Sequence, residues 1–130
     1  ATDQKWEESY QIRTENSPKF SDFVAVKDKQ IIKFFKNSEE FLGKYNIVEF
    51  IGLMKLSEIG SKKIIQKYEY LEKNQKGKFH YAPSFKKAKI IDLLEELRLN
   101  NIEIKIQNIS GNWCEIDTNQ DLEIAKKFFK

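Results

Sequence analysis

Residues 47–56 read IVEFIGLMKL, a nearly continuous apolar run that contains one acidic residue, Glu49. Such a run is typical of a β-strand buried on both faces, as in sheets covered by helices. The segments around this run alternate between helical and extended patterns. We therefore predict an α/β fold, in which a layered mixed sheet is flanked by helices.

The segments that follow the run predict two helices. Ser57 or Ser61 can cap the first helix. Its apolar positions lie at helical spacing, and they are Ile64, Ile65, Tyr68 and Leu71. The second helix ends at residues 100–101. Its apolar positions are Ile90, Leu93, Leu94 and Leu97.

Shorter elements are expected on either side of these. Residues 3–13 predict a short helix, and runs 22–26 and 30–35 predict a hairpin. Residues 102–106 alternate isoleucine with polar residues, which indicates a half-buried strand. Residues 113–116 predict another short strand. Thr118 then caps a last helix, with Asp121 three residues on in a capping box.

The composition fits one soluble domain over residues 1–130, with 40% hydrophobic and 33% charged residues. A net charge of +3 with interspersed signs is too mild for nucleic-acid binding, although it suits a phosphate-bearing ligand. No apolar run is long enough for a membrane span or a signal peptide. A lone Cys114 indicates a reducing, cytoplasmic location.

Glu49 is the first candidate site residue, because a carboxylate is rarely buried without a partner. One interpretation is that Lys55 or another basic side chain neutralises it. The other is that Glu49 faces a ligand ammonium or hydroxyl. In that case Gly52 allows a ligand or a backbone to approach closely.

The segment Gly111–Asp121, GNWCEIDTNQD, is the second candidate. Glu115 and Asp117 would share one face of a strand that ends before a helix, which is where open α/β sheets place their ligands. Two such carboxylates suit Mg²⁺. The structural alternative is that Asp117 only caps the helix and Glu115 is solvated.

Aromatic side chains could form a cage for a quaternary ammonium group. The candidates are Trp6, Tyr10, Tyr45 and Trp113. The alternative is that these rings belong to the core. His80 lies between Phe79 and Tyr81, and we interpret it as a packing residue.

Three segments resemble one branch of the nucleotidyltransferases, which contains bacterial CTP:phosphocholine cytidylyltransferases and related aminoethylphosphonate and sugar-phosphate enzymes. Residues 113–118, WCEIDT, with Asp121 and Leu122, are similar to a W-x-E-I-D-T-x-x-D-L signature of that branch. Residues 49–53 are the second match, and Thr2-Asp3 through Trp6 the third. Together they span nearly the whole chain.

The resemblance implies Mg²⁺-dependent attack of a substrate phosphate or phosphonate oxygen on the α-phosphorus of CTP, with release of pyrophosphate. Asp117 matches a metal-binding acid of the family and is the expected catalytic residue. Asp3, Trp6, Glu49 and Glu115 are the expected substrate-binding residues. The implied fold is the C-terminal portion of a nucleotide-diphospho-sugar transferase-like fold.

The chain departs from the family in having no glycine-rich loop for the triphosphate and no earlier metal-binding aspartate. We therefore expect a C-terminal, acceptor-binding part that is inactive alone and that self-associates through an open sheet edge. The alternative is a non-catalytic interaction module that retains the fold. Phosphocholine, aminoethylphosphonate, a phosphorylated amino-acid derivative and a sugar phosphate all remain possible acceptors.

Overall fold

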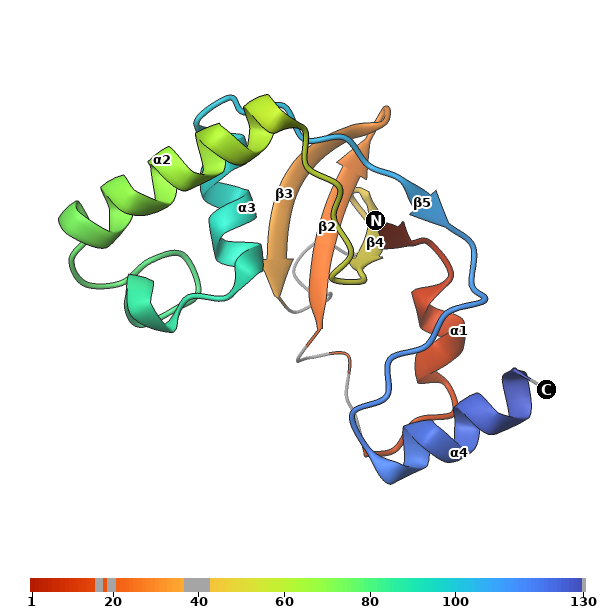
Figure 1. Cartoon of the computed structure of the whole chain (residues 1–130). Helices are drawn as coiled ribbons and strands as arrows, with labels where there is room; N and C mark the ends of the chain where they lie inside the picture. Colours follow the sequence, from red (N-terminus) through yellow and green to blue (C-terminus); the bar gives the residue numbers. More distant parts are fainter. Residues whose placement is uncertain (16–17, 19–20, 37–42, 130) are drawn as a thin grey trace.

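The computed structural model describes residues 1–15, 18, 21–36 and 43–129, and it contains one mixed five-stranded sheet with helices on both faces (Figure 1). The strands are β1 (Thr2–Asp3), β2 (Asp22–Lys27), β3 (Gln30–Lys36), β4 (Asn46–Phe50) and β5 (Asn108–Ile109). The helices are α1 (Trp6–Tyr10), α2 (Glu58–Asn74), α3 (Ile90–Leu99) and α4 (Asn119–Phe128), with a 3-10 turn, η3 (Phe85–Lys87). The α/β class predicted from the sequence is therefore confirmed.

The strands follow the order β3-β2-β4-β1-β5. β1 and β5 are parallel, and the other neighbouring pairs are antiparallel. The predicted hairpin is confirmed: β2 and β3 meet at Asp28 and Lys29, whose φ angles are 51° and 64°. Two residues in this left-handed region match the right-handed twist of the strands that they join.

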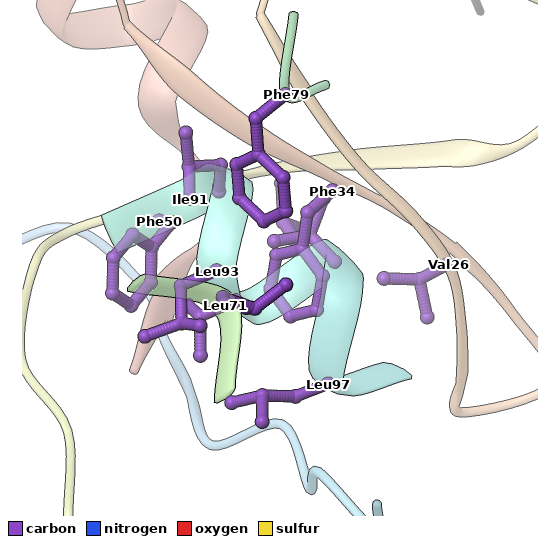
Figure 2. Packing of buried hydrophobic residues seen from close by; sticks show 11 residues of the cluster. Val26, Phe34, Phe50, Leu71, Phe79, Ile91, Leu93 and Leu97 are labelled. Carbon is purple, nitrogen blue, oxygen red and sulfur yellow. The ribbon is translucent and has the colours of Figure 1, made fainter. Parts of the chain in front are cut away.

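β4 divides the core because successive side chains along a strand point to opposite faces. Val48 and Phe50 point to the face covered by α2 and α3, where they join a cluster that includes Leu71 and Leu97 (Figure 2). We call this the α2–α3 face. Glu49 points to the opposite face, which α1 covers and which we call the α1 face.

The α1 face has a smaller apolar cluster of Trp6, Phe23, Ala25 and Phe35. Phe23 is directly opposite Glu49 in the β2–β4 register, and Asp3 is opposite it in the β1–β4 register. A carboxylate pair therefore lies in an otherwise apolar layer between the sheet and α1. That position makes Glu49 the starting point for the site.

The predicted strand 47–56 is correct in its first half only. β4 ends at Phe50, and Gly52 has a φ of 76°, which turns the chain out of the sheet. Leu53 and Leu56 are exposed as a result. No atom lies within 4 Å of a Cβ added to Gly52, so this glycine serves the turn and not a close approach.

The helices predicted after this run are confirmed. Ser57 caps α2, since its side chain accepts a hydrogen bond from the Gly60 N–H. α3 begins at Ile90 and ends before Asn100, as the spacing of its leucines predicts. The first helix is shorter than the predicted 3–13, because Thr2 and Asp3 pair with β4 as strand β1.

The two strands predicted near the carboxyl end need correction. Residues 102–107 alternate in burial as expected, yet strand pairing begins only at Asn108. Residues 113–116 form no strand. Gly111 and Asn112 both have positive φ angles, 68° and 56°, and they turn the chain off the sheet before Trp113.

Candidate functional site

Glu49 is buried, with 2% of its surface exposed, and only one of its carboxylate oxygens is satisfied. The Tyr10 hydroxyl donates to Glu49 Oε1 at 2.6 Å and also pairs with the Ser21 hydroxyl. Glu49 Oε2 is buried and has no hydrogen-bond partner among the residues that the structure describes. An unsatisfied buried carboxylate oxygen is costly, so the site is set up to accept a hydrogen bond.

Burial raises the pKa of Glu49 to about 7. The hydroxyl groups of Tyr10 and Ser21 and the charge of Arg13 favour the ionised form, while the negative charge of Glu115 disfavours it. Burial, together with Glu49, also raises the pKa of Tyr10, so this phenol remains protonated and acts as a donor. Glu49 can therefore gain or lose a proton near neutral pH.

Arg13 connects Glu49's surroundings to the segment before α4. Its Nε lies 3.1 Å from Asp121 Oδ1, and these two side chains are 2% and 0% exposed. Its Nη2 donates to the Glu115 carbonyl oxygen at 3.0 Å. The guanidinium also lies over the Tyr10 ring, 5.0 Å from its centroid. The buried Arg13 guanidinium thus fixes the end of α1 against the segment Gly111–Asp121, which we call the acidic segment.

The start of α4 is held by a capping box of Thr118 and Asp121. Asp121 Oδ2 accepts from the N–H groups of Asp117 and Thr118, at 3.2 and 2.9 Å. Thr118, and not Asp117, is the N-cap residue of α4, while Glu115 is exposed, as the structural alternative has it. The Asp117 backbone is fixed while its side chain is exposed.

Glu115 is exposed as a residue, yet burial of its carboxyl group raises its pKa. The neighbouring charges of Asp117, Asp121 and Asp22 act in the same direction, and Arg13 opposes them. Glu115 and Asp117 are therefore close neighbours, as predicted, although the backbone between them is not a strand. The negative charge of Glu115 also acts on Glu49, and Tyr10 and Arg13 connect the two regions through the contacts given above.

Lys55 does not neutralise Glu49. It is exposed and lines a cavity on the α2–α3 face, whereas Glu49 lies on the α1 face. The basic side chain that does act on Glu49 is Arg13, which the sequence interpretation missed. A weak signal was available, because Tyr10 and Arg13 are three residues apart at the end of a predicted helix.

Asp3 is 2% exposed and its Oδ1 accepts from the N–H groups of Lys5 and Gly111, at 2.9 and 3.1 Å. These bonds hold the turn at Gly111 beside β1, so Asp3 positions the acidic segment. Its role in substrate binding stays a prediction.

Trp6 is 6% exposed and packs edge-on against Phe23, with ring centroids 4.8 Å apart. Its indole N–H donates to the Ile47 carbonyl oxygen at 3.1 Å. The ring therefore belongs to the apolar cluster of the α1 face, and an aromatic cage would need it to become exposed. Trp113 is half-buried and lines a separate cavity of about 130 Å³ between α1 and α4.

His80 packs edge-on against Phe79 and pairs with Glu96, at 3.1 Å from Nε2 to Oε2. Its interpretation as a packing residue agrees with these contacts.

No group of three or more His, Cys, Asp or Glu residues in the described ranges is placed to hold a metal ion. Mg²⁺ commonly takes only one or two protein carboxylates and completes its shell with water and substrate phosphates. The pair Glu115 and Asp117 fits that donor set.

Comparisons with protein families, curated proteins and solved structures give no match to this chain. None of the helices in the described ranges has the length and hydrophobicity needed to cross a membrane.

Proposed function

We propose that this chain is the acceptor-binding part of a Mg²⁺-dependent nucleotidyltransferase, with a nucleotide-diphospho-sugar transferase-like fold. The reaction would transfer CMP from CTP to a small phosphorylated alcohol, phosphonate or sugar phosphate and release pyrophosphate. The observation that carries the proposal is the unsatisfied, buried Glu49 Oε2 beside the segment with Glu115 and Asp117. That segment also bears the residues that resemble the family signature.

Glu49 would bind the acceptor. A ligand ammonium or hydroxyl donating to Oε2 would restore the hydrogen bond that the fold leaves unmade. Tyr10 holds the other oxygen, so the carboxylate has a fixed direction. With a pKa of about 7, Glu49 is substantially ionised at neutral pH, and a cationic ligand group would increase that fraction.

Asp117 would hold the metal, with Glu115 in a supporting role. Bound Mg²⁺ would supply positive charge between the phosphates of the two substrates. The chain's own contribution is rigidity. Asp121 accepts from the Asp117 N–H, and Arg13 binds the Glu115 carbonyl oxygen. Such transfers need positioning and charge neutralisation more than a protein nucleophile.

The second candidate function is a non-catalytic interaction module. The observation in its favour is that the predicted acceptor site is largely occupied by the protein's own contacts. Asp3 binds two backbone N–H groups and Trp6 is packed against Phe23 in the core of the α1 face. A module of this kind would bind neither acceptor nor Mg²⁺ at Glu49 and Asp117.

The first test is acceptor binding to the 130-residue chain, measured by calorimetry with phosphocholine, aminoethylphosphonate and a sugar phosphate, with and without Mg²⁺. Glu49→Gln should weaken the preferred acceptor roughly tenfold or more, about the effect of one charge-assisted hydrogen bond. The matched control Glu72→Gln, an exposed acid on α2, should bind normally. No binding of any of these acceptors at millimolar concentration would favour the module.

The second test is activity in a polypeptide that also carries the nucleotide-binding half. Asp117→Asn should lower pyrophosphate release roughly 10²-fold or more, and Glu115→Gln should lower it less. The chain alone should release none. Asp117→Asn should keep its thermal stability, whereas Asp121→Asn should lose it because it breaks a buried ion pair. Normal turnover by folded Asp117→Asn would contradict the metal assignment.

A further inference from the structure

The hydroxyl groups beside Glu49 have no proton left for its second oxygen. Tyr10 carries one hydroxyl proton and donates it to Glu49 Oε1 at 2.6 Å. The contact between the Tyr10 and Ser21 hydroxyls therefore uses the proton of Ser21. Glu49 Oε2 is buried and has no hydrogen-bond partner in the part of the chain that the structure describes. A donor to Oε2 has to come from a group other than these two hydroxyls.

Protonation of Glu49 does not remove this need for a partner. A neutral carboxyl group with its proton on Oε2 has a buried O–H that requires an acceptor, whereas the ionised group requires a donor there. A proton on Oε1 would instead face the hydroxyl that Tyr10 already donates to this oxygen. A buried polar atom without a partner is costly in either state. A ligand N–H or O–H directed at Oε2 satisfies the ionised state.

The charges around Glu49 favour a donor that is positively charged. The negative charge of Glu115 acts on Glu49, and the charges of Asp117 and Asp121 act on Glu115. Arg13 supplies positive charge to both glutamates. Its guanidinium is already paired with Asp121 and bound to the Glu115 carbonyl oxygen. Negative charge therefore remains in excess among these interacting groups, and a cationic ligand group would offset it.

A quaternary ammonium group would need aromatic faces, and the neighbouring rings are already occupied. Trp6 is 6% exposed and belongs to the apolar cluster of the α1 face, against which Tyr45 also packs. The Tyr10 ring has the Arg13 guanidinium over it, 5.0 Å from its centroid. Trp6 lies at its edge, with ring centroids 6.0 Å apart. Trp113 lines the separate cavity between α1 and α4. These rings form no cage around Glu49.

We propose that the acceptor bound at Glu49 carries a protonated amine with at least one N–H, which donates to Oε2, and that the site discriminates against trimethylammonium and neutral hydroxyl groups. This inference rests on the proposed function and narrows its acceptor class. A trimethylammonium group has the same charge but no N–H, so it leaves Oε2 unpaired. A hydroxyl group can donate but brings no charge, and such hydrogen bonds are weaker.

The test is a series of phosphate monoesters that keeps the positive charge and removes N–H groups in steps. The series is phosphoethanolamine, its N-methyl and N,N-dimethyl derivatives, and phosphocholine. Calorimetry with the 130-residue chain and Mg²⁺ should show a loss of roughly tenfold or more at the last step, where the final N–H disappears. Each earlier step should cost less. The neutral analogue 2-hydroxyethyl phosphate should also bind roughly tenfold or more weakly than phosphoethanolamine.

Glu49→Gln separates hydrogen bonding from the bulk of the methyl groups. A preference for phosphoethanolamine over phosphocholine that comes from bulk would persist in this variant. A preference that comes from the carboxylate should shrink at least fivefold. Glu72→Gln, the exposed control on α2, should keep the full preference. A thermal melt of both variants checks that they are folded under the conditions of the titration.

Proton release gives a readout that a merely structural role of Glu49 would not produce. With a pKa of about 7, Glu49 is half protonated at pH 7. Pairing with an ammonium group lowers that pKa, so binding should release roughly half a proton per ligand. Calorimetry in buffers with different ionisation enthalpies measures this release. Glu49→Gln measures the part that comes from the phosphate of the ligand, which is subtracted.

Two results would overturn this inference alone. The first is binding of phosphocholine or 2-hydroxyethyl phosphate to the parent chain as tightly as phosphoethanolamine. The second is a preference for phosphoethanolamine that Glu49→Gln leaves unchanged, which would assign it to bulk. If none of the compounds binds at millimolar concentration, the proposed function fails together with this inference. Selective amine binding without pyrophosphate release by the polypeptide that carries both halves would contradict the proposed reaction and support the assignment of Glu49.

Discussion

Glu49 shows how one buried side chain can set the pH dependence of a whole fold. Its pKa rises from the ordinary 4.5 to about 7 in the folded protein, chiefly through burial. The folded protein therefore binds this proton more tightly than the unfolded chain. The contribution of Glu49 to stability is greatest below pH 4.5, falls as the pH rises to about 7, and is constant above that. The loss is on the order of 3 kcal/mol.

We predict that Glu49→Gln removes most of this loss, because glutamine has no charge to bury. Between pH 5 and pH 8 the parent chain should lose roughly 2–3 kcal/mol more unfolding free energy than the variant does. Urea denaturation at the two pH values measures the difference. Asp22, whose pKa is also raised, titrates in both proteins and its contribution cancels.

Glu72→Gln serves as the control, since this acid is exposed on α2. It should follow the parent chain at both pH values. Parallel stability curves for the parent and Glu49→Gln would show that Glu49 is not desolvated as the structure describes.

At the residue scale, the sequence identified the anomalous residue but not its partners. A single acid in an apolar strand was enough to single out Glu49. The sequence pattern suggests Tyr10 only for a cage and does not single out Arg13, because both residues are far from Glu49 in the sequence, Tyr10 by 39 positions. Pairing over such a sequence separation depends on tertiary structure, which no local pattern encodes.

At the scale of single elements, the turn of the β2–β3 hairpin has a strained backbone, and substitutions in the turn can test this. Asp28 and Lys29 both adopt positive φ, which suits Asn and Gly better than residues with long side chains. We predict that the double change Asp28→Asn and Lys29→Gly raises the unfolding free energy by about 0.5–1 kcal/mol. Thermal denaturation should show a higher midpoint.

The control for this prediction is Lys62→Gly, on the exposed surface of α2. Glycine costs about 1 kcal/mol there, because a helix interior gains nothing from its freedom. A higher unfolding free energy for the variant with Lys29→Gly and a lower one for Lys62→Gly would support the turn geometry. Destabilisation by both would show that Lys29 contributes through its side chain.

Elements with a repeating pattern, a cap or a hairpin turn could be predicted from the sequence, whereas the carboxyl-terminal strands, which depend on pairing with distant segments, could not. Ser57, Thr118 and the leucine spacing of α3 gave correct helix positions. Residues 102–106 have the alternation of a strand without a paired neighbour. Residues 113–116 have strand propensity, but the turn at Gly111 and the contact with Arg13 take them away from the sheet.

At the scale of the whole molecule, the two edges of the sheet differ. The β3 edge is covered by α3, where Glu95 Oε2 accepts from the Phe34 N–H at 2.9 Å. Glu95 is held in turn by Arg98, at 2.7 Å in the ion pair. Beyond β5 no further strand follows within the described part of the chain. Self-association through a sheet edge would therefore use β5.

We predict that the average mass of the chain rises with concentration and that Asn108→Pro suppresses the rise. Gln107 and Ile109 pair with β1 through their carbonyl oxygens, so the Asn108 N–H faces away from the sheet. Proline removes that outward donor and leaves the bonds to β1 in place. Light scattering across a concentration series at constant salt measures the effect.

The matched control is Asn108→Ala, because both changes lose the side-chain bond from the Thr2 hydroxyl and only proline loses the N–H. Alanine should associate like the parent chain, and the two variants should melt within a few degrees of each other. If proline and alanine reduce the mass equally, the side chain and not the edge makes the contact. If neither reduces it, association uses another surface, and the exposed apolar residues Leu53 and Leu56 become the next to change.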